Sequence, residues 1–240
     1  MRETTSPTGA ADQPGTLVLG IDTCGPSGSV ALGRRRGAAV EILGQVELEG
    51  RSYSATLVAA VGDLLAEFGV GLRKLEAIVA VNGPGSFTGV RVGLSAVKGL
   101  AEGAGIAVVA VSRLEVLAAR SEVAAAALDA HRHEVFLRIA GPGAAPVELL
   151  AGAAELAAID PRPLRIACCD EAASLLLASA WPAAEIVRCA APTAADALLL
   201  CAGRVGAGDF ADLALLDGHY LRRSDAEIFG EAAGTAAARP

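Results

Sequence analysis

Aromatic residues are scarce in this sequence, and several other features are absent altogether. Only 3% of the 240 residues are Phe, Trp or Tyr, so Ala, Val and Leu must fill the core. The N-terminal stretch MRETTSPTGAADQPG has no apolar segment of the kind found in secretory signals. No uninterrupted apolar run reaches the ~18 residues of a membrane span. We therefore expect a soluble, cytoplasmic protein that does not contact the membrane.

The charge balance restricts the classes of function. Hydrophobic residues make up 53% of the chain and charged residues 20%, which indicates a packed globular protein. The formal net charge is −7, whereas an autonomous nucleic-acid binder needs a basic surface. Any contact with RNA should therefore depend on a partner that supplies positive charge. The basic run Arg34 to Arg36 is interpreted as the solvated tip of a hairpin.

Neither the cysteines nor the histidines form a recognisable metal motif. The five cysteines include no C-x-x-C pair, and we interpret them as reduced core thiols. His131 and His133 lie close to Asp129 in the stretch DAHRHEV. The chain has no H-x-x-x-H helix and no Cys/His cluster, so a polar turn is favoured over a metal site. The cysteines are Cys24, Cys168, Cys169, Cys189 and Cys201.

One pattern of elements occurs twice along the chain. The order strand, strand, strand, helix, strand, helix is predicted in each copy, and each copy opens with an apolar strand that ends on an aspartate, Asp22 or Asp129. We expect two α/β subdomains, at 16–112 and 113–224, between loose tails at 1–15 and 225–240. Such a duplication is typical of the actin-like ATPase fold, where a nucleotide cleft would bring the two aspartates face to face. The alternative is two unrelated α/β stretches.

The stretch VNGPGSFTGVRVG is interpreted as a strand end, a tight turn and a helix start. It lacks the lysine and the spacing of a Walker A loop, and it misses the third glycine of a dinucleotide fingerprint by one place. Gly83, Pro84 and Gly85 fit turn chemistry, with Ser86 as the N-cap of a helix that includes Gly89. An anion at the helix N-terminus remains an alternative.

Two predicted helices, at 54–68 and 86–105, carry more apolar and small residues than one sheet face requires. Small residues permit close helix approach, and an uncovered apolar patch usually indicates a partner. The alternative is that the protein's own loops cover both helices. The predicted interface positions are Ala55, Ala59, Gly62, Ala66, Gly89, Gly93 and Ala96.

No catalytic set is evident in the sequence. There is no G-x-S-x-G elbow, and the serines lie near no obvious histidine. Asp22 and Asp129 could bind a magnesium-nucleotide, but neither a third carboxylate nor a catalytic base accompanies them. An accessory subunit is therefore favoured over an autonomous ATP-dependent phosphotransferase or peptidase.

Five stretches resemble the TsaB (YeaZ) family of bacterial tRNA threonylcarbamoyladenosine biosynthesis proteins. They are LVLGIDTCGPSGSVAL, GPGSFTGVRVGLSAVKGLA, VSRLEVLA, ALDAHRHEVFL and YLRR. The resemblance implies an actin-like (ASKHA) fold of two ribonuclease-H-like subdomains, each β-β-β-α-β-α. The GPGSFTG run is its most specific part and is shared in variants with the catalytic paralogue TsaD, whose paired metal-binding histidines this chain lacks.

The resemblance also implies a role without catalysis. TsaB-like proteins are pseudoenzymes that bind TsaD, which transfers threonylcarbamoyl to adenosine 37 of tRNAs reading ANN codons. ATP and metal are expected on TsaD and on the small ATPase TsaE, and no cofactor is expected on this chain. A homodimer is expected when the chain is alone, with tRNA contacted only through the complex. Tyr53 departs from the histidine that many relatives carry at the start of the first helix.

Overall fold

The structure is a computed structural model that describes residues 15–50, 52–141 and 143–222. The predicted loose tails, residues 1–15 and 225–240, lie outside the described residues apart from Gly15. Within the described ranges, no helix combines the length and the apolar character that a membrane crossing requires.

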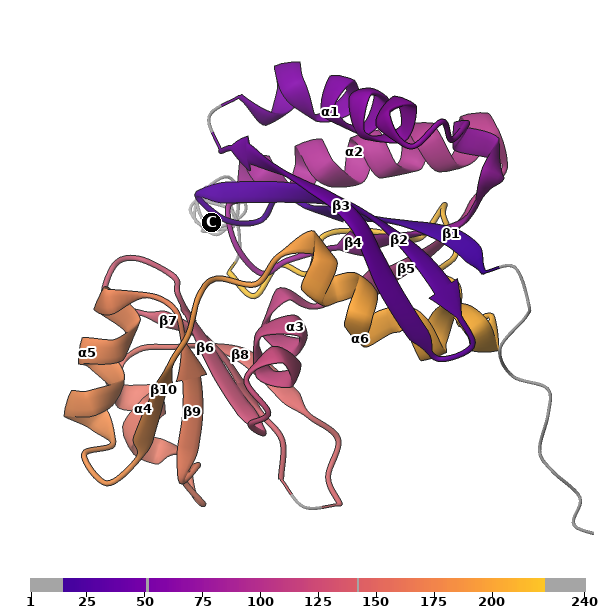
Figure 1. Cartoon of the computed structure of the whole chain (residues 1–240). Coiled ribbons are helices and arrows are strands. Elements are labelled where there is room, and N and C mark those ends of the chain that lie inside the picture. Colours follow the sequence, from indigo (N-terminus) through magenta and orange to yellow (C-terminus); the bar gives the residue numbers. More distant parts are fainter. Residues whose placement is uncertain (1–14, 51, 142, 223–240) are drawn as a thin grey trace, which may run out of the picture.

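The first half of the chain forms a five-stranded sheet with strand order β3-β2-β1-β4-β5 (Figure 1). The strands β1, β2 and β3 pair antiparallel, while β1, β4 and β5 are parallel. A single 3₁₀ turn, Leu72–Lys74, precedes β4. The elements are β1 (Thr16–Asp22), β2 (Ser27–Arg36), β3 (Ala39–Glu49), α1 (Tyr53–Glu67), β4 (Leu75–Val81), α2 (Phe87–Ala104), β5 (Ala107–Val111) and α3 (Arg113–Arg120).

The second half repeats this arrangement in a sheet ordered β10-β9-β6-β7-β8. Numbered within each half, both sheets have the order 3-2-1-4-5. The predicted duplication of an α/β unit is therefore confirmed, and each copy continues with one more strand and helix. The elements are β6 (Ala125–Asp129), β7 (Val135–Ile139), β8 (Val147–Ala151), α4 (Ala153–Ala158), β9 (Arg165–Cys168), α5 (Glu171–Ala180), β10 (Glu185–Arg188) and α6 (Ala194–Ala207).

The last helix of each half packs on the sheet of the other half. Helix α6 follows the second sheet in the sequence, yet it contacts all five strands of the first sheet. Helix α3 follows the first sheet and contacts β6, β7 and β9 of the second. Figure 1 shows α6 on the face of the first sheet opposite to α1 and α2. The predicted subdomain ranges, 16–112 and 113–224, remain predictions, and this exchange of helices links the two halves.

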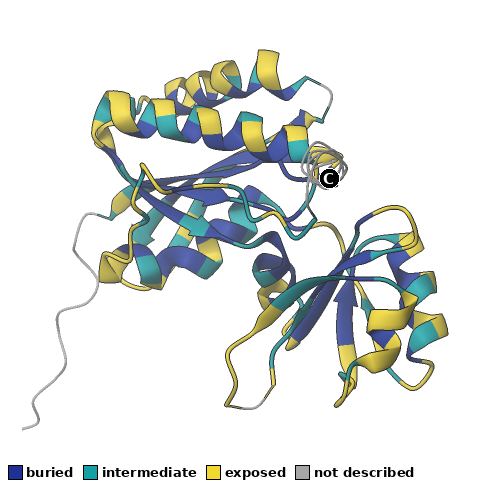
Figure 2. Cartoon of the chain, turned by 180° about the vertical axis from the view of Figure 1, so that it is seen from behind, coloured by how far each residue is buried: buried dark blue, intermediate teal, exposed yellow. Residues whose placement is uncertain are grey.

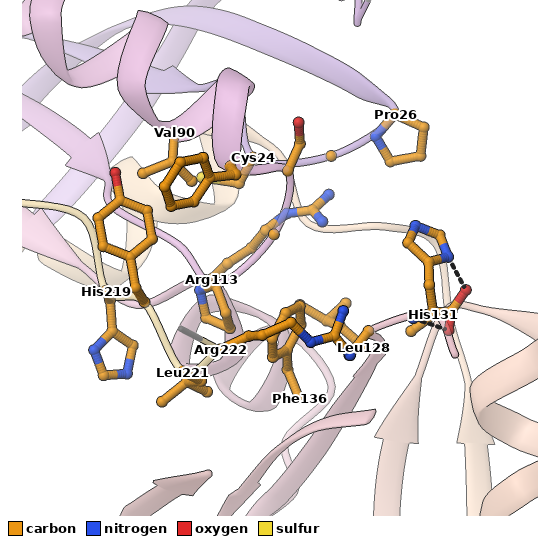
Figure 3. A pocket seen from close by; sticks show the side chains of 18 of the residues that line it. Cys24, Pro26, Val90, Arg113, Leu128, His131, Phe136, His219, Leu221 and Arg222 are labelled. Atoms are coloured by element: carbon orange, nitrogen blue, oxygen red, sulfur yellow. Dashed lines mark hydrogen bonds and ion pairs between the residues drawn. The ribbon is translucent and has the colours of Figure 1, made fainter. Parts of the chain in front are cut away.

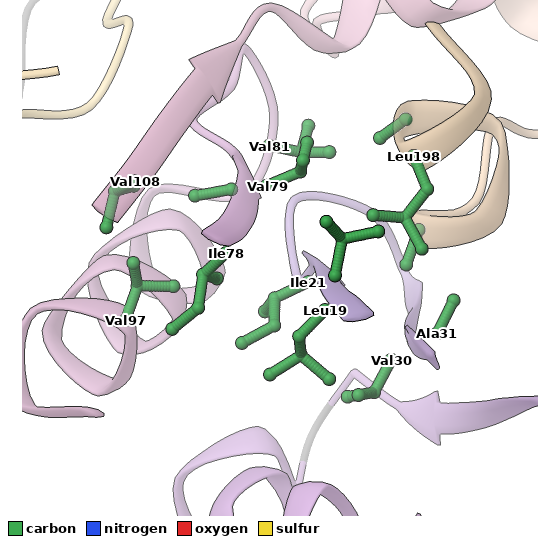
Figure 4. Close-up of a cluster of buried hydrophobic side chains, with 14 of the residues drawn as sticks. Leu19, Ile21, Val30, Ala31, Ile78, Val79, Val81, Val97, Val108 and Leu198 are labelled. Carbon is green, nitrogen blue, oxygen red and sulfur yellow. The ribbon is translucent and has the colours of Figure 1, made fainter. Parts of the chain in front are cut away.

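Aliphatic side chains fill the core, as the scarcity of aromatics predicts. Figure 4 shows Leu19 and Ile21 of β1 on the side of the sheet where Ile78 of β4 lies, and Val79 of β4 on the side of Leu198 of α6. A Cβ at Gly20 would overlap the backbone of Ala194, so this glycine lets α6 lie close to β1. All five cysteines are free thiols, and Cys24, Cys168 and Cys201 are fully buried. Burial raises the pKa of each of these three thiols.

Candidate functional site

A cavity of about 900 Å³ lies between the two halves. Each of the five stretches that carry the family resemblance contributes residues to its wall. The cavity therefore gathers segments that are far apart in the sequence, and Figure 3 shows side chains from both halves around it. Its lining includes Cys24 to Pro26, Pro84 to Phe87 with Val90, Arg113, Leu128 to Arg132 with Phe136, and His219 to Arg222.

The glycine-rich turn forms one wall of the cavity and starts α2. Gly83 has φ +111°, a backbone conformation that favours glycine, and the Gly83–Pro84 peptide bond is cis. A Cβ at Gly85 would overlap the backbone of Cys24, whose carbonyl oxygen accepts a hydrogen bond of 2.7 Å from the Ser86 N–H. The Ser86 hydroxyl accepts from the Gly89 N–H at 3.2 Å and so caps α2. The turn thus joins the β1–β2 loop to a helix start, which agrees with its sequence-based interpretation.

Asp22 is buried and paired within the protein. Its carboxylate accepts one hydrogen bond from the Cys24 N–H at 2.8 Å and another from Arg113 Nε at 3.3 Å. The Asp22 side chain is 1% exposed and that of Arg113 is 6% exposed. Asp22 is not among the residues that line the cavity, whereas Arg113 is. The expectation that Asp22 faces Asp129 across the cleft is therefore wrong for Asp22, because Arg113 lies over its carboxylate.

Tyr53 fixes the loop that follows Asp22. This residue, which departs from the family's histidine, is buried and donates a hydrogen bond of 2.9 Å from its hydroxyl to the Gly25 carbonyl. Burial, together with the nearby negative charge of Asp22, raises the pKa of Tyr53 to about 12. A neutral hydroxyl that donates to a backbone carbonyl is therefore its form at physiological pH, which indicates a structural role.

Asp129 lines the cavity from the second half. Its carboxylate accepts from the His131 backbone N–H at 2.8 Å and lies 3.0 Å from His131 Nδ1. The three residues His131, Arg132 and His133 all have positive φ, so they form the polar turn that the sequence predicts. No group of three His, Cys, Asp or Glu side chains within the described ranges is arranged to hold a metal ion.

These residues do not fit the magnesium-nucleotide site that an actin-like fold implies. Such a site needs free carboxylate oxygens to hold hydrated Mg²⁺ beside the phosphates. The Asp22 carboxylate instead accepts hydrogen bonds from Cys24 N–H and Arg113 Nε, and the Asp129 carboxylate lies against His131. The side chain that the cavity wall presents at this point is the positively charged Arg113, not the Asp22 carboxylate.

The YLRR stretch closes another part of the cavity wall. Tyr220 packs on Phe87 with ring centroids 4.9 Å apart, and the Arg91 guanidinium lies 3.8 Å from the Phe87 centroid. Leu221 packs into the core between α3 and the second sheet, and Arg222 forms an ion pair with Glu134. The C-terminal segment therefore contacts both halves. The sequence identifies this segment through the YLRR motif of the family, but it does not show which residues the segment contacts.

Glu148 joins four separate elements beside the cavity, and sequence reasoning missed it. Its carboxylate accepts hydrogen bonds from Ser112 Oγ at 2.7 Å and Arg138 at 2.6 Å, and it lies 2.8 Å from His219 Nε2. Burial disfavours the charged carboxylate, but the hydrogen bonds from His219, Ser112 and Arg138 outweigh burial and lower the pKa of Glu148. A single glutamate in a short strand gives no sequence signal for such a network.

The predicted interface positions separate into two groups. On α1 all four positions are exposed, and the neighbouring Val58 is 58% exposed. These five residues, Ala55, Val58, Ala59, Gly62 and Ala66, are called the α1 face below. On α2, Ala96 is half-buried against the core. Figure 2 shows exposed residues along the outer sides of both helices.

Gly89 and Gly93 do not belong to an exposed interface. Both are buried, and a Cβ at either position would overlap Thr23 of the same chain. The Thr23 hydroxyl also donates a hydrogen bond of 2.7 Å to the Gly89 carbonyl. The small residues Gly89 and Gly93 therefore let α2 approach Thr23 in the loop that follows β1. The prediction of a partner contact at these two glycines is wrong.

Comparison with known proteins places this architecture in context. A profile of the family TsaD, described as tRNA N6-adenosine threonylcarbamoyltransferase, matches residues 45–141. The tRNA threonylcarbamoyladenosine biosynthesis protein TsaB of Haemophilus influenzae is 37% identical over 125 residues, which cover 50% of this chain and 51% of that protein. The chain thus spans about half the length of the curated TsaB relatives that it matches.

Two further relatives extend the similarity over most of the chain. An uncharacterized protein of Mycobacterium tuberculosis is 32% identical over 88% of this chain and 94% of its own length. A Pseudomonas aeruginosa crystal structure, described as an uncharacterized protein with similarity to peptidase YEAZ, has a TM-score of 0.69 and 28% identity, covering 86% of this chain and 100% of that one. With the repeated sheet order, this likeness confirms the actin-like (ASKHA) fold of two ribonuclease-H-like subdomains.

Proposed function

This chain belongs to the TsaB (YeaZ) family, and we propose that it is a non-catalytic subunit in the formation of threonylcarbamoyladenosine at adenosine 37 of tRNAs that read ANN codons. It binds and activates a TsaD homologue in the cytoplasm, and TsaD carries the transferase centre. The ATP and the metal belong to TsaD and to the TsaE ATPase. With a net charge of −7, the chain contacts tRNA only through the complex.

The observation that carries this proposal is the α1 face. Five exposed residues, from Ala55 to Ala66, present only methyl groups, hydrogen atoms and one valine side chain to solvent. A Cβ at Gly62 would meet no atom within 4 Å, so nothing in the described part of the chain covers this position. A helix from another protein can approach such a surface closely and bury it. The same face serves a homodimer when the chain is alone.

The lack of a reactive arrangement in the cavity supports an accessory role. Asp22 is neutralised by Arg113, and burial raises the pKa of Cys24 well above its ordinary value, so its thiol is not activated. Within the described ranges no serine or cysteine is hydrogen-bonded to a histidine. These features argue against the alternative of an autonomous enzyme, either a phosphotransferase or a peptidase, because both need an activated group.

Reconstitution tests this function, with purified homologues of TsaD, of TsaE and of TsaC, the pathway enzyme that makes the threonylcarbamoyl-adenylate. The modified nucleoside is measured by mass spectrometry after incubation of an ANN-reading tRNA with ATP and the pathway's substrates. We expect the product only when this chain is added, and none when this chain is incubated alone. An undiminished yield in the mixture that omits the chain would disprove the proposal, as would product formation by the chain without TsaD.

A further inference from the structure

Arg113 has hydrogen-bonding capacity that the protein itself does not use. Its side chain is 6% exposed and donates one hydrogen bond, from Nε to Asp22. Within the described part of the chain, Nη1 and Nη2 have no acceptor. No fully enclosed side-chain nitrogen in these ranges lacks a partner, so these two nitrogens reach the open space of the cavity. Figure 3 shows the guanidinium group projecting into that space.

The backbone around this guanidinium is shaped to leave it uncovered. A Cβ at Gly25 would overlap Nη2 of Arg113, so a side chain at position 25 would fill the space beside it. The hydroxyl of Tyr53 holds the Gly25 carbonyl in place. Asp22 fixes the other edge of the guanidinium through Nε. The free edge of Arg113 is therefore held in one orientation, which is what recognition of a planar oxyanion requires.

The rest of the cavity wall near Arg113 is mostly apolar. Leu128 and Phe136 belong to the second sheet, Leu221 to the C-terminal segment, and Val90 to α2. A cavity of about 900 Å³ with apolar side chains beside a charged group that has unused donors has the general properties of a site for a small organic molecule.

The charges around the cavity select among anions. Asp129 and Asp170 also line it, and Asp22 lies directly behind Arg113. The other basic residues of the wall each have a partner within the protein; they are His131, Arg132, His219 and Arg222. These three carboxylates disfavour a ligand that carries several negative charges unless a metal ion accompanies it. The described residues contain no group of three or more His, Cys, Asp or Glu side chains arranged to hold such an ion. A ligand with one negative charge can pair with the free edge of Arg113 at a smaller electrostatic cost.

We propose that this cavity is a metal-independent binding site for a small organic monocarboxylate. The carboxylate accepts two parallel hydrogen bonds from Nη1 and Nη2 of Arg113, and the apolar body of the ligand lies against Leu128, Phe136 and Leu221. This inference does not depend on the proposed role in tRNA modification, because it concerns the isolated chain and is tested without any partner.

Titrations of the full chain in EDTA test this site. Benzoate and hexanoate are the carboxylate probes, benzyl alcohol is the uncharged control, and phenyl phosphate is a competing anion. Mg-ATP, the second competing anion, is titrated in a separate experiment with Mg²⁺ and without EDTA. Binding is followed by saturation-transfer difference NMR. We expect saturable binding of at least one carboxylate, without a requirement for Mg²⁺, and about tenfold weaker binding or none for benzyl alcohol.

Variants connect this binding to Arg113. Replacing Arg113 alone would leave Asp22 as an unpaired buried charge, so the double variant Asp22→Asn/Arg113→Met removes both charges together. We expect it to bind the carboxylate about tenfold more weakly or worse. Leu221→Trp, which occupies cavity space without touching the ion pair, should weaken binding as well. Arg188→Met removes an exposed arginine that pairs with Glu171 and is the matched control, with unchanged affinity.

Several outcomes would overturn the assignment. These are no saturable binding of either carboxylate, equal binding of benzyl alcohol, a requirement for Mg²⁺, or unchanged affinity in both cavity variants. Tighter binding of phenyl phosphate or Mg-ATP than of the carboxylates would identify a phosphate site instead. Circular dichroism and the unfolding midpoint establish that each variant is folded, and Leu221→Trp keeps the test decisive if the double variant is not.

Discussion

Thr23 lies between two glycines of α2 and shows how single residues set the packing of the first half. Its hydroxyl donates to the Gly89 carbonyl, and both Gly89 and Gly93 approach it without room for a Cβ. The sequence shows a stripe of small residues on this helix but does not show what the stripe faces. The same pattern on α1 is exposed. Residue type alone therefore could not distinguish a contact within the chain from a contact with a partner.

Substitution of these glycines should separate buried from exposed positions on one helix. Gly89→Ala places a methyl group against the Thr23 backbone and should lower the free energy of unfolding by about 1–3 kcal/mol. Gly99→Ala is the matched control, because a Cβ there meets nothing within 4 Å, and it should raise the free energy of unfolding by about 0.5–1 kcal/mol. Urea denaturation measures both. Equal effects at the two positions would contradict the packing described for Thr23.

The sequence predicts the local conformation of some cavity residues, but it does not predict the contacts between distant ones. Ser86 as an N-cap and the turn at 131–133 follow from local patterns, and the structure contains both. The pairing of Asp22 with Arg113 spans 91 residues and depends on how the two halves meet. Sequence reasoning assigned Asp22 to the cleft because it could not identify the side chain that covers it.

At the scale of elements, apolar periodicity was sufficient to predict the strands and helices. The sequence predicts one helix at 54–68, and α1 lies at Tyr53–Glu67. It predicts another at 86–105, and α2 lies at Phe87–Ala104. Local signals determine these boundaries. The connections between elements have no such signal. Glu148 on β8 is an example. Its carboxylate contacts Arg138 of β7, Ser112 at the start of α3 and His219 of the C-terminal segment.

The contribution of Glu148 to stability should depend on pH. Hydrogen bonds lower its pKa in the folded state below the ordinary value of 4.5. Its stabilising effect is therefore complete above that value and is lost as the pH falls through the folded-state pKa. At about pH 7, Glu148→Gln should lower the free energy of unfolding by about 1–3 kcal/mol.

The difference between wild type and Glu148→Gln should narrow as the pH falls below 4.5. Urea denaturation at several pH values measures it, and Glu171→Gln, at an exposed ion pair, is the control with little effect at any pH. A difference that stays constant down to about pH 3 would show that the charge of Glu148 contributes nothing to stability.

For the whole molecule, the exchange of α3 and α6 makes the two halves depend on each other. Leu198 in α6 is 1% exposed and belongs to the core of the first half, whereas the adjacent Leu199 is 52% exposed. The sequence predicts α6 as a helix but assigns it to the second half by position. The structure shows that α6 covers the face of the first sheet opposite to α1 and α2. The first sheet is therefore covered on both faces only when the end of the second half is present.

Leu198→Ala should therefore destabilise the first half although it lies late in the chain. We expect a loss of about 2–5 kcal/mol in the free energy of unfolding and faster amide hydrogen exchange in β1 and β2. Leu199→Ala should change the free energy of unfolding by less than about 0.5 kcal/mol. Faster exchange confined to β9 and β10 in Leu198→Ala would contradict the placement of α6 on the first sheet.

The central claim is that the exposed α1 face is the surface that binds TsaD. The most direct test is isothermal titration calorimetry of the TsaD homologue from the same organism with the wild type, with Ala59→Arg on the α1 face, and with Ala178→Arg at an exposed position of α5. We predict that Ala59→Arg weakens binding by at least about tenfold, while Ala178→Arg and the wild type bind equally. Equal affinity of all three proteins would contradict the account.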